Sequence, residues 1–193
     1  EKIDLRSVKW RNRSLTGLLS KKVYPQMMVF DLSSADTDAG GWDCLFHSIV
    51  DIEPSPMISS IVWDNNFITC PIVDFFTRMQ FLNYLSISDC RIADDNGRIL
   101  EALERLLTDA NIEKLRIRKT LDHLGSNSFQ QLQTSLSANK TIRLLDVSFN
   151  KIGDVGLATL TQIAQNNTTI REYHFDGSEP TSVNSLIDLL DEF

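Results

Sequence analysis

The clearest pattern in this chain of 193 residues is Ile142-Arg143-Leu144-Leu145-Asp146-Val147-Ser148-Phe149-Asn150-Lys151-Ile152. If Ile142 is step 0, apolar residues stand at steps 0, 3, 5 and 10, and an asparagine stands at step 8. Leu145 and Val147 alternate with polar residues, as a short strand with one buried face requires. An asparagine directly after a strand can hydrogen-bond backbone groups that the turning chain would otherwise leave unpaired. The pattern therefore predicts a strand that ends at Asn150.

The same frame occurs several times along the chain. It begins again at Ile112 and Leu82, at intervals of 30 residues, and it continues 28 residues later at Ile170. Ile58 starts an earlier frame, and two weaker frames start at Leu5 and Pro25. Apolar residues with helical spacing lie between the frames, over 99–107, 129–136, 157–164 and 182–193. The chain is thus predicted to repeat a strand and a helix in units of 28–30 residues.

These features resemble the leucine-rich repeats of the ribonuclease-inhibitor class, whose signature is LxxLxLxxNxL. The phrase from Asn139 to Gly156 is similar to repeats of tropomodulin-like and CARMIL-like cytoskeletal regulators and of NOD-like receptors. The resemblance implies an α/β solenoid, or horseshoe, of about five to seven repeats with parallel strands inside and helices outside. We expect one domain over 1–193, with irregular repeats in 1–57, clearer repeats in 58–193 and the last helix as a cap. We also expect the chain to be a fragment of a longer protein.

One frame predicts a local exception. The unit that starts at Ile112 has Thr120 at step 8 and Asp122 at step 10, where the signature requires Asn and an apolar residue. We therefore expect an irregular loop around residues 118–125 in place of the regular turn.

Composition excludes several classes of function. The net charge is -7, which argues against generic nucleic-acid binding because that depends on Lys and Arg. No apolar run is long enough to cross a membrane, and the N-terminus does not resemble a signal peptide. Three cysteines without CxxC spacing favour free thiols over disulfides or zinc. We therefore expect a cytoplasmic protein that binds neither nucleic acid nor membrane.

On a strand of this kind, steps 2, 4, 6 and 7 face the concave side of the solenoid. The strand at Leu115 places four cations there, and such close like charges repel. Either a partner or neighbouring acids such as Asp89 and Asp146 would neutralise them. The predicted partner-binding residues are Tyr84, Lys114, Arg116, Arg118, Lys119, Leu144, Asp146, Phe149 and His174.

The two weak N-terminal frames give further concave rows. The frame from Pro25 yields Met27, Val29, Asp31 and Leu32, and the frame from Leu5 yields Ser7, Lys9, Arg11 and Asn12. Met27, Val29 and Leu32, the apolar residues of the row from Pro25, are either an exposed contact surface or a sign that this frame is misplaced. The sequence leaves both alternatives open.

The predicted function is non-catalytic binding of another protein that has an acidic and partly apolar surface. No nucleophile motif or phosphate-binding glycine loop occurs, so we expect no enzyme activity and no cofactor. His174 lies between Glu172 and Asp176, but solvated polar surface is a better interpretation of this trio than a metal site. The alternatives are a GTPase-activating module resembling the Ran GTPase activators, which use the same repeat class, and a sensor segment of a larger receptor.

Overall fold

The fold is described by a computed structural model, which describes residues 2–4, 6, 28–35, 57–93, 96–124 and 127–192. Within these ranges a parallel sheet runs through seven strands in the order β1-β2-β3-β5-β7-β8-β9. Its strands are β1 (Lys2–Asp4), β2 (Met28–Asp31), β3 (Ile58–Val62), β5 (Tyr84–Ser86), β7 (Lys114–Arg116), β8 (Leu144–Asp146) and β9 (Glu172–His174). A second, two-stranded parallel sheet pairs β4 (Phe67–Ile68) with β6 (Arg91–Ile92).

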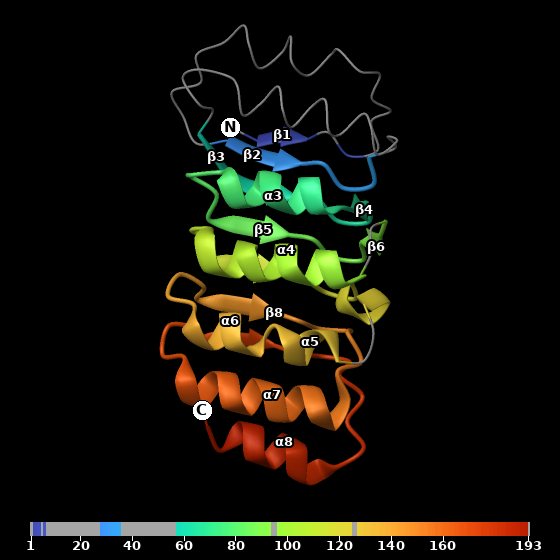
Figure 1. The fold of residues 1–193 in the computed structure, drawn as a ribbon, viewed down its shortest axis with the longest axis vertical. Helices are drawn as coiled ribbons and strands as arrows, with labels where there is room; N and C mark the ends of the chain where they lie inside the picture. The colour runs from blue at the N-terminus through green and yellow to red at the C-terminus, as the bar shows by residue number, and fades with distance from the viewer. Residues whose placement is uncertain are drawn as a thin grey trace, which may run out of the picture.

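Helices form a second layer beside the large sheet. They are α3 (Cys70–Arg78), α4 (Asn96–Asp109), α5 (Ser128–Gln131), α6 (Gln133–Ala138), α7 (Gly153–Asn166), α8 (Val183–Leu190) and the short 3-10 helix η1 (Leu121–Leu124). Figure 1 shows them following one another down the long axis in chain order. Neighbouring helices α3 and α4, α6 and α7, and α7 and α8 contact each other. The architecture is the predicted solenoid with parallel strands on one side and helices on the other.

The clear frames predicted the strands correctly. Leu85, Leu115 and Leu145 are the central residues of β5, β7 and β8, and they pair directly with one another in register. Each of these leucines is buried, and so are the residues at step 5 of the same units, Ile87, Ile117 and Val147. The residues at step 3 and the residues at step 5 both point into the space between the sheet and the helices, and they therefore form the core of the solenoid.

The residues at step 8 form a ladder of buried hydrogen bonds. The Asn66 amide donates to the carbonyls of Leu32 (2.8 Å) and Trp63 (2.9 Å). Asn150 donates in the same way to Ile117 (2.6 Å) and Val147 (2.7 Å). Each asparagine thus joins its own unit to the preceding unit, because it donates to the step-5 carbonyl of both units.

The frame that starts at Pro25 is wrong by two residues. β2 pairs Phe30 with Ile61, so Phe30 occupies step 3 and the frame begins at Met27. The Leu32 amide donates to the Val62 carbonyl at 2.8 Å, and the Leu32 side chain is 5% exposed. Leu32 is therefore a core residue and is not part of the concave surface. Met27 itself lies outside the described ranges.

The first weak frame also fails to predict the strand that is present. β1 comes before Leu5, and its Ile3 pairs with Phe30. The expected row of Ser7, Lys9, Arg11 and Asn12 lies outside the described residues.

Over the described residues 118–124, the irregular loop that was expected is replaced by the regular turn at Lys119 followed by a short 3-10 helix, and residue 125 lies outside the described residues. Thr120 is fully buried at the position where the signature has an asparagine. Its hydroxyl replaces the asparagine amide, because it donates to the Ile87 carbonyl at 2.6 Å and accepts from the Cys90 amide at 3.1 Å. The chain then forms η1, whose Leu121 and Leu124 are buried. These leucines supply the apolar contact that Asp122 cannot make at step 10.

Candidate partner-binding surface

The side chains at step 7 are fixed by an unusual backbone conformation. Asp89, Lys119 and Phe149 all have positive φ, between 52° and 62°. In each case the amide donates to a carbonyl of the next unit, at Arg118 (2.7 Å), Ser148 (3.1 Å) and Asp176 (2.6 Å) respectively. This regular turn places one side chain per unit at the C-terminal end of each strand.

The next unit has a glycine at step 7, and Phe149 explains why. A Cβ atom added to Gly177 would meet the Phe149 ring at 2.6 Å. Gly177 also has a φ of +64°, which a glycine adopts without strain. Gly177 therefore lets the Phe149 ring lie close against the next unit, with 45% of the residue still exposed.

A buried carboxylate, that of Asp146, lies at the centre of the surface. Asp146 is 3% exposed, and its Oδ1 accepts a hydrogen bond from the Ser148 amide at 3.1 Å. Its Oδ2 lies 3.7 Å from Arg116 Nε, 3.8 Å from Arg118 Nε and 3.7 Å from His174 Nδ1. One carboxylate thus holds side chains from two strands, β7 and β9. His174 also makes a 2.8 Å contact through Nε2 with Glu172.

Each arginine of this group contacts an aromatic ring. The Arg116 guanidinium carbon lies 5.7 Å from the centre of the Tyr84 ring, and its Nη1 donates to the Tyr84 hydroxyl at 3.2 Å. The Arg118 guanidinium carbon lies 5.1 Å from the centre of the Phe149 ring. Such cation–π contacts contribute about 0.5–1 kcal/mol each at exposed sites. They restrain two long side chains that would otherwise be mobile.

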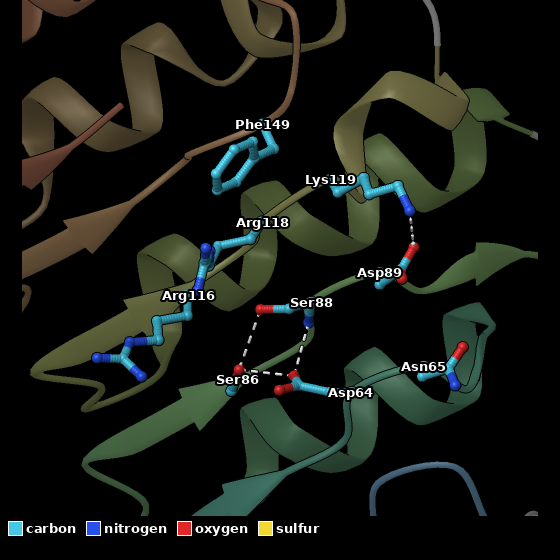
Figure 2. A pocket seen from close by; sticks show the side chains of 9 residues that line it. All are labelled: Asp64, Asn65, Ser86, Ser88, Asp89, Arg116, Arg118, Lys119 and Phe149. Carbon is cyan, nitrogen blue, oxygen red and sulfur yellow. Dashed lines mark hydrogen bonds and ion pairs between the residues drawn. The ribbon is translucent and has the colours of Figure 1, made fainter. Parts of the chain in front are cut away.

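Beside the arginines the concave face has a hollow of about 380 Å³. Figure 2 shows Phe149, Arg118 and Arg116 along one side and Asp64 and Asn65 across from them. The Asp64 carboxylate accepts hydrogen bonds from the Ser86 hydroxyl (2.6 Å) and the Ser88 amide (2.8 Å). Lys119 Nζ lies 3.0 Å from Asp89 Oδ1. The hollow therefore has a basic, aromatic side and an acidic side.

Most of the predicted site residues come together. Tyr84, Arg116, Arg118, Asp146, Phe149 and His174 form one network, and Lys119 lines the hollow beside it. Lys114 is exposed at the start of β7. Leu144 is only 8% exposed, so the expectation that it presents an apolar contact to solvent is wrong. The acids that could neutralise the basic row are in place, since Asp89 pairs with Lys119 and Asp146 with both arginines.

The predicted partner-binding residues did not include the acidic side of the hollow. Asp64, Asn65, Ser86, Ser88 and Asp89 all line it. They occupy the same steps as the selected residues, in the frames that begin at Ile58 and Leu82. The repeat frame therefore places all five on the concave face, where Asp89 was expected as a neutralising acid.

The two described cysteines, Cys70 and Cys90, are buried thiols outside any disulfide bond, as expected, whereas Cys44 lies outside the described residues. Cys90 stands at step 8, where its thiol lies 3.5 Å from the Trp63 carbonyl. Burial disfavours the charged thiolate and raises the pKa of Cys90 to about 12. Tyr173 is half-buried, and desolvation raises its pKa to about 12 as well.

These raised pKa values predict a loss of stability in alkali. The thiol has a pKa near 9 in the unfolded chain. The stability that the folded protein gains from a neutral Cys90 is therefore fully present below about pH 9 and is lost as the pH rises towards 12. We expect the free energy of unfolding, measured by urea denaturation, to fall over this interval. Cys90→Thr places a non-ionising donor in the slot, as Thr120 does, and should make the fall shallower. An equal fall in this variant would contradict the role of Cys90.

A solenoid of parallel strand–helix units, with a buried polar or thiol side chain at step 8 after β3, β5, β7, β8 and β9, has the architecture of leucine-rich-repeat proteins. In agreement, the family model described as Leucine Rich repeat matches residues 138–160 of this chain. Among solved structures, the chain is similar to the tropomodulin C-terminal domain of Caenorhabditis elegans at 9% identity and a TM-score of 0.48. That similarity covers 81% of this chain and 91% of the other. No curated protein sequence matches the chain.

In the part of the chain that the structure describes, no helix is both long and apolar enough to cross a membrane. Within the same residues, no group of three or more His, Cys, Asp or Glu side chains is arranged to hold a metal ion.

Proposed function

We propose that this chain is a non-catalytic module that binds another protein on its concave face, in a reducing compartment such as the cytoplasm. The observation that carries the proposal is an exposed aromatic side chain, Phe149, held beside two restrained arginines over a hollow. Aromatic and arginine side chains of this kind supply most of the binding energy at protein interfaces. The proposed partner has an acidic and partly apolar surface.

The rigidity of the site supports this proposal. The strands, the left-handed turns and the Asp146 contacts fix the side chains before any partner arrives. A pre-formed surface loses less conformational entropy on binding than a mobile one. The basic row of β7 would also accelerate encounter with an acidic partner.

The test is a triple variant that reverses the charge and removes the ring, Arg116→Glu with Arg118→Glu and Phe149→Ala. We expect it to lose the proteins that the unchanged chain captures from a lysate, because both the charge and the apolar contact are gone. The measurement is a pull-down analysed by mass spectrometry, repeated with the purified captured protein. A thermal melt verifies that the variant is folded.

A matched control changes the charge equally on the helical side. Arg78→Glu with Lys140→Glu and Val155→Ala alters three exposed residues and should capture the same proteins as the unchanged chain. A second control, Val183→Ser with Ile187→Ser and Leu190→Ser, removes the exposed apolar stripe of α8. If either control loses the partner while the concave variant keeps it, binding lies elsewhere and the proposal is wrong.

A further inference from the structure

Resting on the proposed function, we infer that Arg116 and Arg118 form a clamp for a single carboxylate of the partner. The group is the side chain of a Glu or Asp in a peptide segment, with an apolar neighbour that packs against Phe149.

The first support is the geometry of Asp146. Its Oδ2 lies 3.7 Å and 3.8 Å from the two Nε atoms, which is an ion-pair separation and longer than a good hydrogen bond. Asp146 therefore holds the two guanidinium groups by charge and takes no hydrogen bond from their Nη atoms, while the Nε of Arg116 is itself buried. Arg116 ends β7 and Arg118 stands two residues further on in the turn, and both side chains reach the same Asp146 oxygen.

The second support is the set of donors that remain. Arg116 gives one N–H to the Tyr84 hydroxyl, and among the described residues Arg118 donates no hydrogen bond at all. The contact of the Arg118 guanidinium carbon with the Phe149 ring, 5.1 Å from the ring centre, restrains Arg118 without using its donors. Guanidinium groups bind carboxylates through two parallel hydrogen bonds when both partners are planar and correctly placed. These two are placed before a ligand arrives.

The local charge favours a carboxylate over a phosphate group. Two guanidinium groups and the Asp146 carboxylate leave one positive charge at the clamp. A carboxylate neutralises that charge, whereas a phosphate dianion would leave an excess negative charge near Asp64 across the hollow, where Lys119 is already paired with Asp89. A phosphorylated segment is therefore the weaker ligand for this site.

The probes are three acetylated, amidated peptides, Gly-Phe-Xaa-Phe-Gly, in which Xaa is Glu, Gln or phosphoserine. Each is titrated to several millimolar into the full chain labelled with ¹⁵N. The readouts are the Nε–Hε signals of Arg116 and Arg118 and the amide of Phe149, assigned with single Arg→Lys variants. We expect the Glu peptide to bind about tenfold more tightly than the Gln peptide, as for a charge-assisted hydrogen bond. The phosphoserine peptide should bind more weakly than the Glu peptide.

Arg116→Lys with Arg118→Lys distinguishes the clamp from the proposed function. This variant keeps both charges but loses the planar donors and the ring stacking. We expect it to bind the Glu peptide about tenfold more weakly and to lose the captured partner. If it captures the partner as well as the unchanged chain, the concave face still binds but the clamp is wrong. Equal binding of the Glu and Gln peptides, tighter binding of phosphoserine, or no shift at these signals would also overturn it.

Discussion

The Trp63→Ala variant is expected to lose roughly 3–5 kcal/mol of unfolding free energy, the usual cost of removing a large aromatic residue from a core. Trp63 follows β3 at step 5 and is fully buried. Its ring meets Phe76 of α3 edge-on, with centroids 5.9 Å apart, and its Nε1 donates to the Phe67 carbonyl at 2.9 Å. The substitution therefore leaves both a cavity between sheet and helix and an unpaired carbonyl. The measurement is urea denaturation followed by far-ultraviolet circular dichroism.

Two further variants calibrate this result. Phe81→Ala removes an aromatic residue that is 40% exposed and should cost less than about 1 kcal/mol. Trp63→Phe retains most of the buried ring area and should fall between the two. If Trp63→Ala costs no more than Phe81→Ala, the assignment of Trp63 to the core of this unit is wrong.

The C-terminal units were predictable because two independent signals agree there. Leu115 and Leu145 share the apolar alternation of a strand, and Asn150 marks its end. The interval of 30 residues then leaves room for one helical segment between strands, and the structure divides the segment expected at 129–136 into α5 and α6. Alternation alone would have been compatible with many β folds.

The N-terminal error follows from the period of the strand. Side chains alternate with a period of two, so a frame moved by two residues keeps the same residues on the same face. Phe30 is buried in either frame, and only its pairing with Ile61 shows that it occupies step 3. Without an asparagine after β2, the sequence contains no signal that distinguishes the two registers.

The network at the site was predictable in position but not in detail. The steps place Tyr84, Arg116 and Phe149 on one face, and the structure confirms that placement. The burial of Asp146 depends on how three neighbouring strands pack, which a single sequence does not show. The same holds for a second asparagine ladder at the helix ends, where the Asn167 amide donates to the Leu136 (2.7 Å) and Asn139 (2.8 Å) carbonyls.

The Asn150→Ala variant is expected to lose about 3 kcal/mol of unfolding free energy, since a buried hydrogen-bonding group left unpaired costs roughly 1–3 kcal/mol. The side-chain amide of Asn150 donates to the carbonyls of Ile117 and Val147, and its Oδ1 accepts a hydrogen bond from the Leu121 amide at 2.8 Å. Alanine would leave two carbonyls and one N–H buried without partners at the junction of two units. Urea denaturation measures the loss, and Asn111→Ala, at an exposed position, is the matched control with an expected change below about 0.5 kcal/mol.

A third substitution separates hydrogen bonding from volume. Thr120 and Cys90 fill the same slot in the two preceding units, so Asn150→Thr should keep one donor and recover part of the stability that Asn150→Ala loses. Asn150→Asp can still accept from Leu121 but cannot donate, and it also buries a charge, so it should be the least stable of the three. An unfolding free energy of Asn150→Ala equal to that of the unchanged chain would show that Asn150 does not join the two units. If Asn150→Thr were no more stable than Asn150→Ala, donation to the step-5 carbonyls would not be what stabilises the turn.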